Sequence, residues 1–229
     1  MIQVDGTLGT CSTATACYTY DAKGQRWNKT MGSIGADFLY DLEGHQVDSI
    51  TSGAWNRSEV YADNRHFATY LSNPMTYFIY SDWLGTERFR TPYVPSTNET
   101  CTNLPFGDGM NCSGTDVSPM HFTGKERDSE SNLDNFGARY DASSMGRFMS
   151  PDPLMASAKV WDPQTWNRYS YTLNNPLRFI DPTGMDEVTA AQCAQDKHCV
   201  TVNVNVIFDK NANDGKGLTD KQKAVLGLT

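Results

Sequence analysis

The chain has 229 residues, a formal net charge of −8, 11% aromatic residues and 18 glycines. The acidic balance, with no run of lysines and arginines, argues against binding to nucleic-acid phosphates or to anionic membranes. No apolar run approaches the roughly 18 residues of a spanning helix, and the first residues lack a secretory signal, so any export signal is expected outside this sequence.

The composition also indicates the fold class. Aromatic, β-branched and turn-forming residues alternate closely along the chain, a pattern that favours many short strands over long helices. We therefore predict a mainly β fold, with enough chain for one substantial core or two small ones.

Residues 1–75 contain a short repeat with the pattern Tyr-Asp-x-x-Gly, and a looser third copy lies at 60–64. The two clear copies are Tyr20, Asp21 and Gly24, and Tyr40, Asp41 and Gly44. In each copy we expect the Tyr on a strand, the Asp bonded to the backbone of a tight turn, and the Gly at positive φ. Such a repeat must stack on neighbours to bury its face, so this region is predicted to be the last repeats of a longer array.

Six cysteines form three local pairs, namely Cys11 with Cys17, Cys101 with Cys112, and Cys193 with Cys199. An even number in loops rich in Gly, Ser and Thr is compatible with three disulfide-closed loops in an oxidising compartment. The alternative is free thiols in loops of a protein kept in the cytoplasm. No zinc site is expected, because the sequence has no CxxC motif and its four histidines are scattered.

A series of short motifs follows in the region 76–185. They are 80–88 (YSDWLGTER), 104–108 (LPFGD), 122–128 (FTGKERD), 135–140 (NFGARY), 146–153 (GRFMSPDP), 167–171 (NRYSY), 174–176 (NNP) and 181–184 (DPTG). In content and order, these motifs and the preceding repeats resemble RHS, or YD-repeat, proteins and their repeat-associated core domain. The departure is Asp141, where many members have a second Tyr.

The positions that carry the resemblance form a signature spread over the whole region. They are Asp82, Leu84, Gly85, Gly124, Glu126, Arg127, Arg139, Tyr140, Gly146, Arg147, Pro151, Asp152, Asn175, Pro176, Pro182 and Gly184. The resemblance implies strand-turn-strand hairpins in a curled β-sheet shell. It also implies a bacterial exported protein, secreted or at the cell surface. Its partners would be its own upstream repeat shell, a downstream toxin or effector tip, and an immunity protein or a cell-surface receptor.

The same resemblance implies one reaction, in which the core domain cuts its own chain just after the DPxG motif. The matching bond here is Met185–Asp186. Asp152 and Asp181 would form an aspartic-type pair, with Arg147 or Arg178 as the neighbouring cation. Two close carboxyls could activate water and protonate the leaving nitrogen. The structural alternative is that both aspartates precede proline and simply form turns.

Residues 186–229 differ in character and are predicted to be the start of a small α/β tip, with a strand at 200–208 and a helix that begins near 219. Asp209, Asn211, Asn213 and Asp220 have oxygen ligands spaced nearly as in a calcium loop. However, the expected Gly is displaced by one position, and a plain turn explains the same residues. No cofactor motif appears, so no cofactor is expected.

Three functions remain open from the sequence. The first is the closing segment of a YD-repeat shell that encapsulates or presents a C-terminal effector. The second is an adhesin or carbohydrate-binding module that uses exposed Tyr and Trp side chains. The third is an intramolecular aspartic autoprotease as the main activity.

Overall fold

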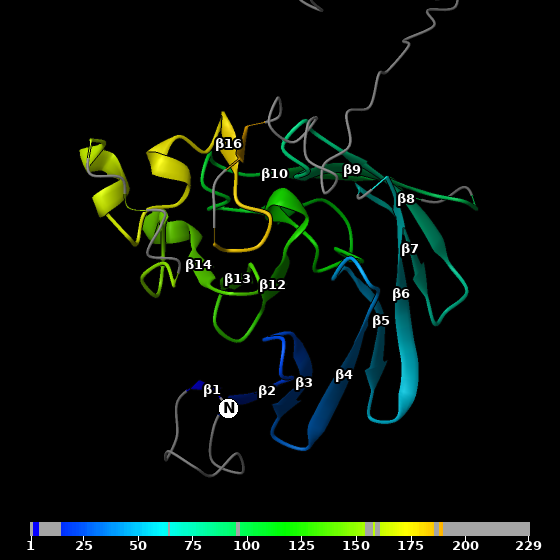
Figure 1. The fold of residues 1–229 in the computed structure, drawn as a ribbon. Coiled ribbons are helices and arrows are strands. Elements are labelled where there is room, and N and C mark those ends of the chain that lie inside the picture. Colours follow the sequence, from blue (N-terminus) through cyan, green and yellow to red (C-terminus); the bar gives the residue numbers. More distant parts are fainter. Residues whose placement is uncertain are drawn as a thin grey trace, which may run out of the picture.

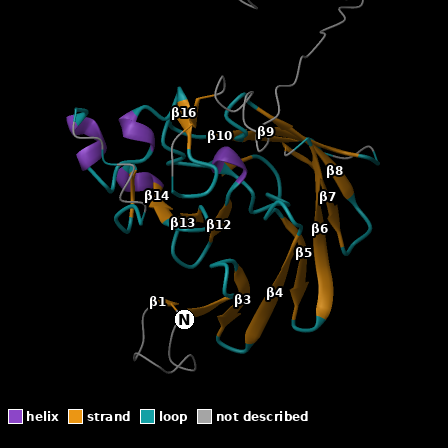
Figure 2. Ribbon diagram, in the orientation of Figure 1, coloured by secondary structure: helices purple, strands orange, loops and turns teal. Residues whose placement is uncertain are grey.

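The computed structural model describes residues 2–4, 15–63, 65–94, 97–153, 158, 161–185 and 188–189. Most of the regular structure is antiparallel β-sheet, as Figure 2 shows, so the predicted mainly β fold is confirmed. None of the helices in these residues is long and apolar enough to span a membrane. The predicted tip lies outside the described residues except for 188–189.

The large sheet has eleven strands that follow one another in sequence order. They are β1 (Ile2–Val4), β2 (Ala16–Tyr20), β3 (Arg26–Met31), β4 (Ile34–Tyr40), β5 (Gln46–Thr51), β6 (Ala54–Ala62), β7 (Arg65–Leu71), β8 (Thr76–Ser81), β9 (Glu87–Pro92), β10 (Glu99–Thr102) and β11 (Asn111–Cys112). Figure 1 shows this sheet curving around the segment that follows it. The sheet continues without a break through the domain boundary predicted at residues 75 and 76.

A small four-stranded sheet follows, with β12 (Glu126–Asp128), β13 (Leu133–Asn135), β14 (Tyr140–Ala142) and β15 (Arg147–Phe148). Four 3-10 turns occur in the described residues, namely η1 (Phe122–Gly124), η2 (Ser143–Met145), η4 (Pro163–Trp166) and η5 (Thr172–Asn174). The last pair of strands is β16 (Phe179–Ile180) and β17 (Val188–Thr189), which are antiparallel.

The repeated Tyr-Asp-x-x-Gly pattern forms the turns of the large sheet. In the first copy, the carboxylate of Asp21 accepts bonds from the backbone N–H groups of Lys23 and Gln25, both at 2.8 Å, and Gly24 has a φ of +83°. Asp41 bonds the N–H of His45 in the same way. Asp82 repeats the arrangement between β8 and β9. The predicted turn is therefore confirmed, and it recurs in the core region.

Buried ion pairs fix the following segment against the inner face of the sheet. Arg26 of β3 is fully buried and its Nη1 lies 2.5 Å from Asp128 of β12, while its Nη2 lies 3.3 Å from Glu126. Lys29, on the same strand, contacts Asp128 at 3.1 Å and Glu130 at 3.3 Å. An unpaired buried charge is very unfavourable, so any shift of the segment along the sheet that separated these pairs would be costly. The ion pairs therefore favour one position of the segment on the sheet.

A compact apolar cluster lies beside this polar interface. Phe122, Phe136, Phe148 and Tyr171 are almost fully buried, and Phe106 packs against them. Their rings meet at centroid distances of 5.4–6.4 Å, mostly edge to face, which is the favourable geometry for aromatic pairs. The cluster therefore joins η1, β15, the residue after β13 and the residue before η5 into one unit that carries the pocket described next.

Candidate active site

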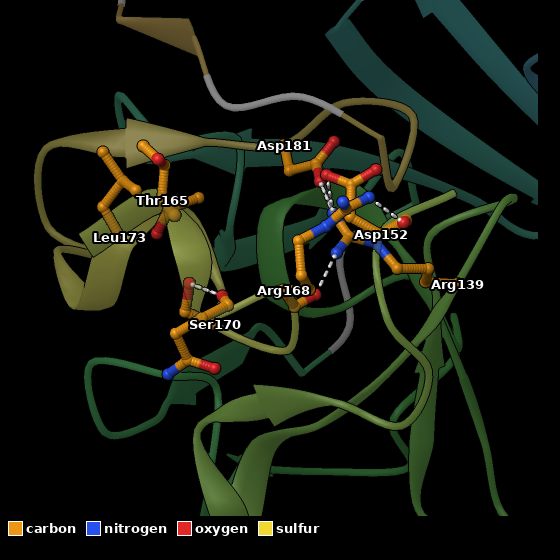
Figure 3. A pocket seen from close by; sticks show the side chains of 9 residues that line it. Arg139, Asp152, Thr165, Arg168, Ser170, Leu173 and Asp181 are labelled. Atoms are coloured by element: carbon orange, nitrogen blue, oxygen red, sulfur yellow. Dashed lines mark hydrogen bonds and ion pairs between the residues drawn. The ribbon is translucent and has the colours of Figure 1, made fainter. Parts of the chain in front are cut away.

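A pocket opens where the ends of the small sheet, η4, η5 and β16 meet, and it contains both predicted aspartates (Figure 3). It is small, with only about 20 Å³ of space in which the centre of a water-sized sphere fits. The lining residues are Arg139, Asp152, Thr165, Asn167, Arg168, Ser170, Thr172, Leu173 and Asp181. The lining is mostly polar and charged, so the pocket suits chemistry on a polar group more than an apolar ligand.

Arg139 is the central cation of the pocket. It directly precedes β14, its guanidinium lies 3.7 Å from the centre of the Phe148 ring, and its side chain is only 4% exposed. Its Nη2 lies 2.9 Å from Asp181 Oδ2 and 3.7 Å from Asp152 Oδ2. A rigid, always charged guanidinium thus brings both carboxylates to one nitrogen.

Asp181 fixes the backbone that leads to the predicted cleavage position. Its Oδ1 accepts bonds from the N–H groups of Thr183 (3.2 Å), Gly184 (2.7 Å) and Met185 (3.1 Å). On the other side of this loop, Arg139 Nε donates to the carbonyl oxygen of Gly184. The residues on the N-terminal side of the Met185–Asp186 bond are therefore held by one carboxylate and one guanidinium.

Glycine is the only residue type that fits position 184 without backbone strain. Its φ is +75°, and a Cβ there would lie 3.0 Å from Arg139 N and from Phe136 O. The loop thus approaches the backbone on either side of the 137–138 turn too closely for any side chain.

Asp152 enters the pocket from the segment after β15. Its N–H donates to the carbonyl oxygen of Arg168 at 2.9 Å, and the guanidinium of Arg168 donates back to the carbonyl oxygen of Asp152. These reciprocal bonds fix the backbone of Asp152, while its side chain, 8% exposed, lies beside Arg139.

Lys125 supports the loop from the FTGKERD motif. Its Nζ donates to the carbonyl oxygen of Pro182 at 2.6 Å and lies 5.7 Å from the centre of the Phe136 ring. Burial lowers the pKa of Lys125, and the nearby charge of Asp181 partly offsets that effect. Neither Lys125 nor Arg168 stands out in the sequence as a site residue, since both belong to motifs far from DPTG.

The cations predicted beside the aspartates need correction. Arg147 is exposed on β15 and Arg178 lies over the ring of Phe179 at 5.2 Å; neither lines the pocket. Arg139 occupies that place instead. Met185 is 43% exposed, and Asp186 lies outside the described residues.

Most other signature residues have structural roles away from the pocket. Asp82 and Gly85 form a turn, Glu126 pairs with Arg26, Arg127 binds Asp134 at 2.6 Å, and Tyr140 bonds Tyr20 at 2.6 Å. The remaining signature residues also lie outside the pocket lining and do not bond its loop. They are Leu84, Gly124, Gly146, Pro151, Asn175 and Pro176.

The cysteine pairs are described in part. Cys101 and Cys112 form a disulfide with an S–S distance of 2.02 Å, which confirms that pair. Cys17 is also disulfide-bonded, and its predicted partner Cys11 lies outside the described residues. Cys193 and Cys199 lie outside them too, as do the calcium candidates Asp209, Asn211, Asn213 and Asp220.

The curved sheet and the segment on its inner face form a fold that is known from solved toxin structures. These structures share it across 80% of this chain. One is a Photorhabdus luminescens Tc holotoxin pore with a mutated TccC3, at a TM-score of 0.60 and 19% identity. Another is a TcdB2–TccC3 assembly without its hypervariable C-terminal region, at a TM-score of 0.55 and 17% identity. The match covers 9% of each of those chains.

Two curated relatives are similar in sequence. They are the tRNA3(Ser)-specific nuclease WapA of Bacillus spizizenii, 27% identical over 177 residues, and the tRNA nuclease WapA of Bacillus subtilis, 29% identical over 177 residues. The match covers 74% of this chain and only 7% of each relative. No family model matches the chain.

Proposed function

We propose that this chain is the closing segment of an RHS, or YD-repeat, shell that encapsulates or presents a C-terminal effector. The support is the curved sheet of repeated turns, the fold shared with TccC3-containing toxin structures, and the sequence similarity to the WapA nucleases. In this proposal the large sheet continues the wall of an upstream repeat array, and the segment after it fills the inside.

The effector would follow the pocket in the chain. One of the similar assemblies lacks a region described as hypervariable and C-terminal, and the WapA relatives are tRNA nucleases. We propose by analogy that residues after 185 lead into a variable effector of a secreted or cell-surface protein. An immunity protein or a cell-surface receptor would be its further partner.

We further propose that the pocket cuts the Met185–Asp186 bond of its own chain. The observation that carries this proposal is the clamp on the preceding loop, in which Arg139 binds the Gly184 carbonyl and Asp181 binds the Met185 N–H. A chain held on one side of a bond, next to a second carboxylate in a polar pocket, has the positioning that intramolecular hydrolysis requires.

The geometry suggests different roles for the two aspartates. Asp181 accepts hydrogen bonds from three backbone N–H groups and forms an ion pair with Arg139, which suits a carboxylate that positions the loop. Asp152 is the better acid–base group. It would take a proton from the attacking water as the new C–O bond forms, and give a proton to the nitrogen of Asp186 as the C–N bond breaks.

The test is electrophoresis of the natural gene product that carries this sequence, in wild-type and variant forms. Wild type is expected to give two pieces, whereas Asp152→Asn and Arg139→Met are expected to remain whole. Arg178→Met is the matched control, because that arginine lies outside the pocket, and it should be cut like wild type. An uncut wild type would contradict self-cleavage and leave the shell role untouched.

The second candidate function is carbohydrate binding, favoured by one observation. Trp83, Trp161 and Trp166 are 59%, 82% and 61% exposed, and exposed aromatic rings commonly stack on apolar sugar faces. A glycan array would test this reading. Binding that is lost on Trp161→Ala and Trp166→Ala would support it, and an array without any bound glycan would contradict it.

A further inference from the structure

One group of metal-ligating side chains occurs in the described residues, and it lies away from the pocket. The ligand atoms of Cys112, Asp116 and His121 all lie within 4.8 Å of one another. Cys112 is bonded to Cys101, so a second sulfur lies 2.02 Å from the first. While the disulfide is intact, neither sulfur is a thiolate ligand.

We propose that reduction of the Cys101–Cys112 disulfide converts this group into a binding site for one zinc-class divalent ion, with Cys101, Cys112, Asp116 and His121 as ligands. The proposal does not rest on the proposed function. The site would replace the covalent link between β10 and β11 with a metal link, so that this edge of the sheet stays closed in a reducing environment.

The donor set selects the kind of ion. Two thiolates, an imidazole nitrogen and one carboxylate oxygen suit zinc or cobalt, whereas magnesium and calcium require mainly oxygen ligands. Zinc bonds of about 2.0–2.3 Å place tetrahedral ligands roughly 3.5 Å apart. The ligand atoms of Cys112, Asp116 and His121 would therefore have to approach one another by up to about 1.3 Å, and the two sulfurs would have to move apart from 2.02 Å after reduction.

The two non-sulfur ligands are already held in place. Asp116 Oδ1 lies 2.9 Å from His121 Nε2 and 2.6 Å from Arg90 Nη1, and Asp116 has a φ of +51°, uncommon for a residue other than Gly. His121 is buried, and its Nδ1 has no hydrogen-bond partner among the described residues. Nε2 is the ring nitrogen that faces Asp116, so it is the nitrogen that would bind the ion.

The surrounding charges favour a cation. Arg90 serves three carboxylates, those of Glu87, Glu99 and Asp116, so the group is negative overall. If Asp116 turns to a metal, Arg90 keeps two buried partners. The Asp116 side chain is 40% exposed and gives the ion a route in.

The redox step balances with a dithiol as the reductant. The dithiol supplies two electrons and two protons, the Cys101–Cys112 bond breaks into two thiols, and the dithiol becomes a disulfide. The metal ion then displaces the two thiol protons into solvent as the sulfur–metal bonds form. The oxidised and metal-bound forms thus exclude each other.

Cobalt titration of the 229-residue chain, followed by absorption, tests the proposal. A phosphine serves as reductant here because it competes little for metal. The reduced chain is expected to bind about one cobalt ion with thiolate charge-transfer and tetrahedral bands, and zinc should displace it. The oxidised chain should show neither band. His121→Gln and Asp116→Asn should each weaken binding at least about tenfold, as loss of a ligand does.

Two controls keep the result interpretable. All cysteines remain in both variants, so other thiols contribute equally, and His45→Gln, which lies in a turn with Asp41, should titrate like wild type. A reduced chain that folds only when cobalt is added would also support the site. Equal binding by wild type, His121→Gln and Asp116→Asn would overturn it, as would a reduced chain that shows no thiolate band.

Discussion

Asp141, the residue at which the sequence departs from the RHS pattern, has an unusual environment. It is fully buried, and within the part of the chain that the structure describes neither of its carboxylate oxygens has a hydrogen-bond partner. Its neighbour on the adjacent strand is Asp134, which forms an ion pair with the guanidinium of Arg127. Burial first, and Asp134 second, raise the pKa of Asp141 to about 7, with Asp181 adding to the effect and Arg127 and Arg139 opposing it.

From this environment we predict that the free energy of unfolding depends on pH. Between the usual carboxyl range and about pH 7, the unfolded chain loses the Asp141 proton and the folded chain keeps it, so stability falls as pH rises. The shift corresponds to a free energy of unfolding lower by on the order of 4 kcal/mol above pH 7. Asp141→Asn should remove most of that loss in chemical denaturation at several pH values, and the two chains should converge near pH 4.

The control is Asp63→Asn, because Asp63 is exposed in a turn. It should leave the pH dependence of unfolding unchanged. An Asp141→Asn chain that is less stable than wild type at pH 7 would contradict the assignment of a neutral, unpartnered carboxyl.

Gly184 gives a second prediction at this scale. Gly184→Ala meets both the positive φ and two backbone atoms at 3.0 Å, and should lower the free energy of unfolding by about 2–3 kcal/mol and slow cleavage. Gly53→Ala has a similar φ of +78° and open space around it, so it should cost only about 1 kcal/mol. Equal losses in denaturation would show that the close approach at Gly184 is unimportant.

The site residues illustrate what sequence reasoning at this scale can reach. Asp152 and Asp181 follow from short motifs, and the structure brings both to one pocket. The cation could not be chosen in the same way, because Arg139 and Arg147 both lie in signature motifs and Arg178 lies between two of them. Only the tertiary packing of Arg139 on Phe148 distinguishes it. The approach of Asp116 and His121 to Cys112 was not foreseen either, because the spacing of these residues matches no motif.

At the scale of elements, the turns were the most predictable feature. Asp21 and Asp82 bond the backbone N–H groups two and four residues ahead, and Asp41 bonds the one four residues ahead. This is a local interaction that a short sequence pattern encodes. The pairing of Arg26 with Asp128 joins residues a hundred positions apart. No short sequence pattern indicates so distant a pair, so the position of β12 against the sheet could not be predicted.

His66 provides a prediction for the strands β6, β7 and β9. It bridges Glu59 at 2.9 Å and Glu87 at 2.5 Å; burial alone would lower its pKa, but the two carboxylates raise it to about 9. Because the pKa of His66 is raised, its ion pairs contribute fully to the free energy of unfolding below pH 6.5, and this contribution is lost as pH rises through about 9. The loss is on the order of 3 kcal/mol.

Thermal or chemical unfolding between pH 6 and 10 would measure it. His66→Gln should abolish this part of the pH dependence, whereas His45→Gln should retain it. A wild-type chain whose stability is flat across pH 6.5–9.5 would contradict the ionised His66 bridge.

At the scale of the whole molecule, the chain is a curved wall with a filling segment on its inner face (Figure 1). The mainly β class follows from composition, and a curled sheet was expected from the resemblance to RHS proteins. The pocket does not, because Arg139, Asp152, Arg168 and Asp181 come from four separate places in the chain. Ion pairs with the wall and the aromatic cluster bring them together, which makes the wall a requirement for the site.

The most direct measurement of the central claim is the intact mass of every fragment in the purified natural gene product. The account predicts one fragment that ends at Met185 and one that begins at Asp186, and a single uncut mass for Asp152→Asn. A single uncut mass for wild type, or a cut at another bond that Asp152→Asn leaves unchanged, would contradict it.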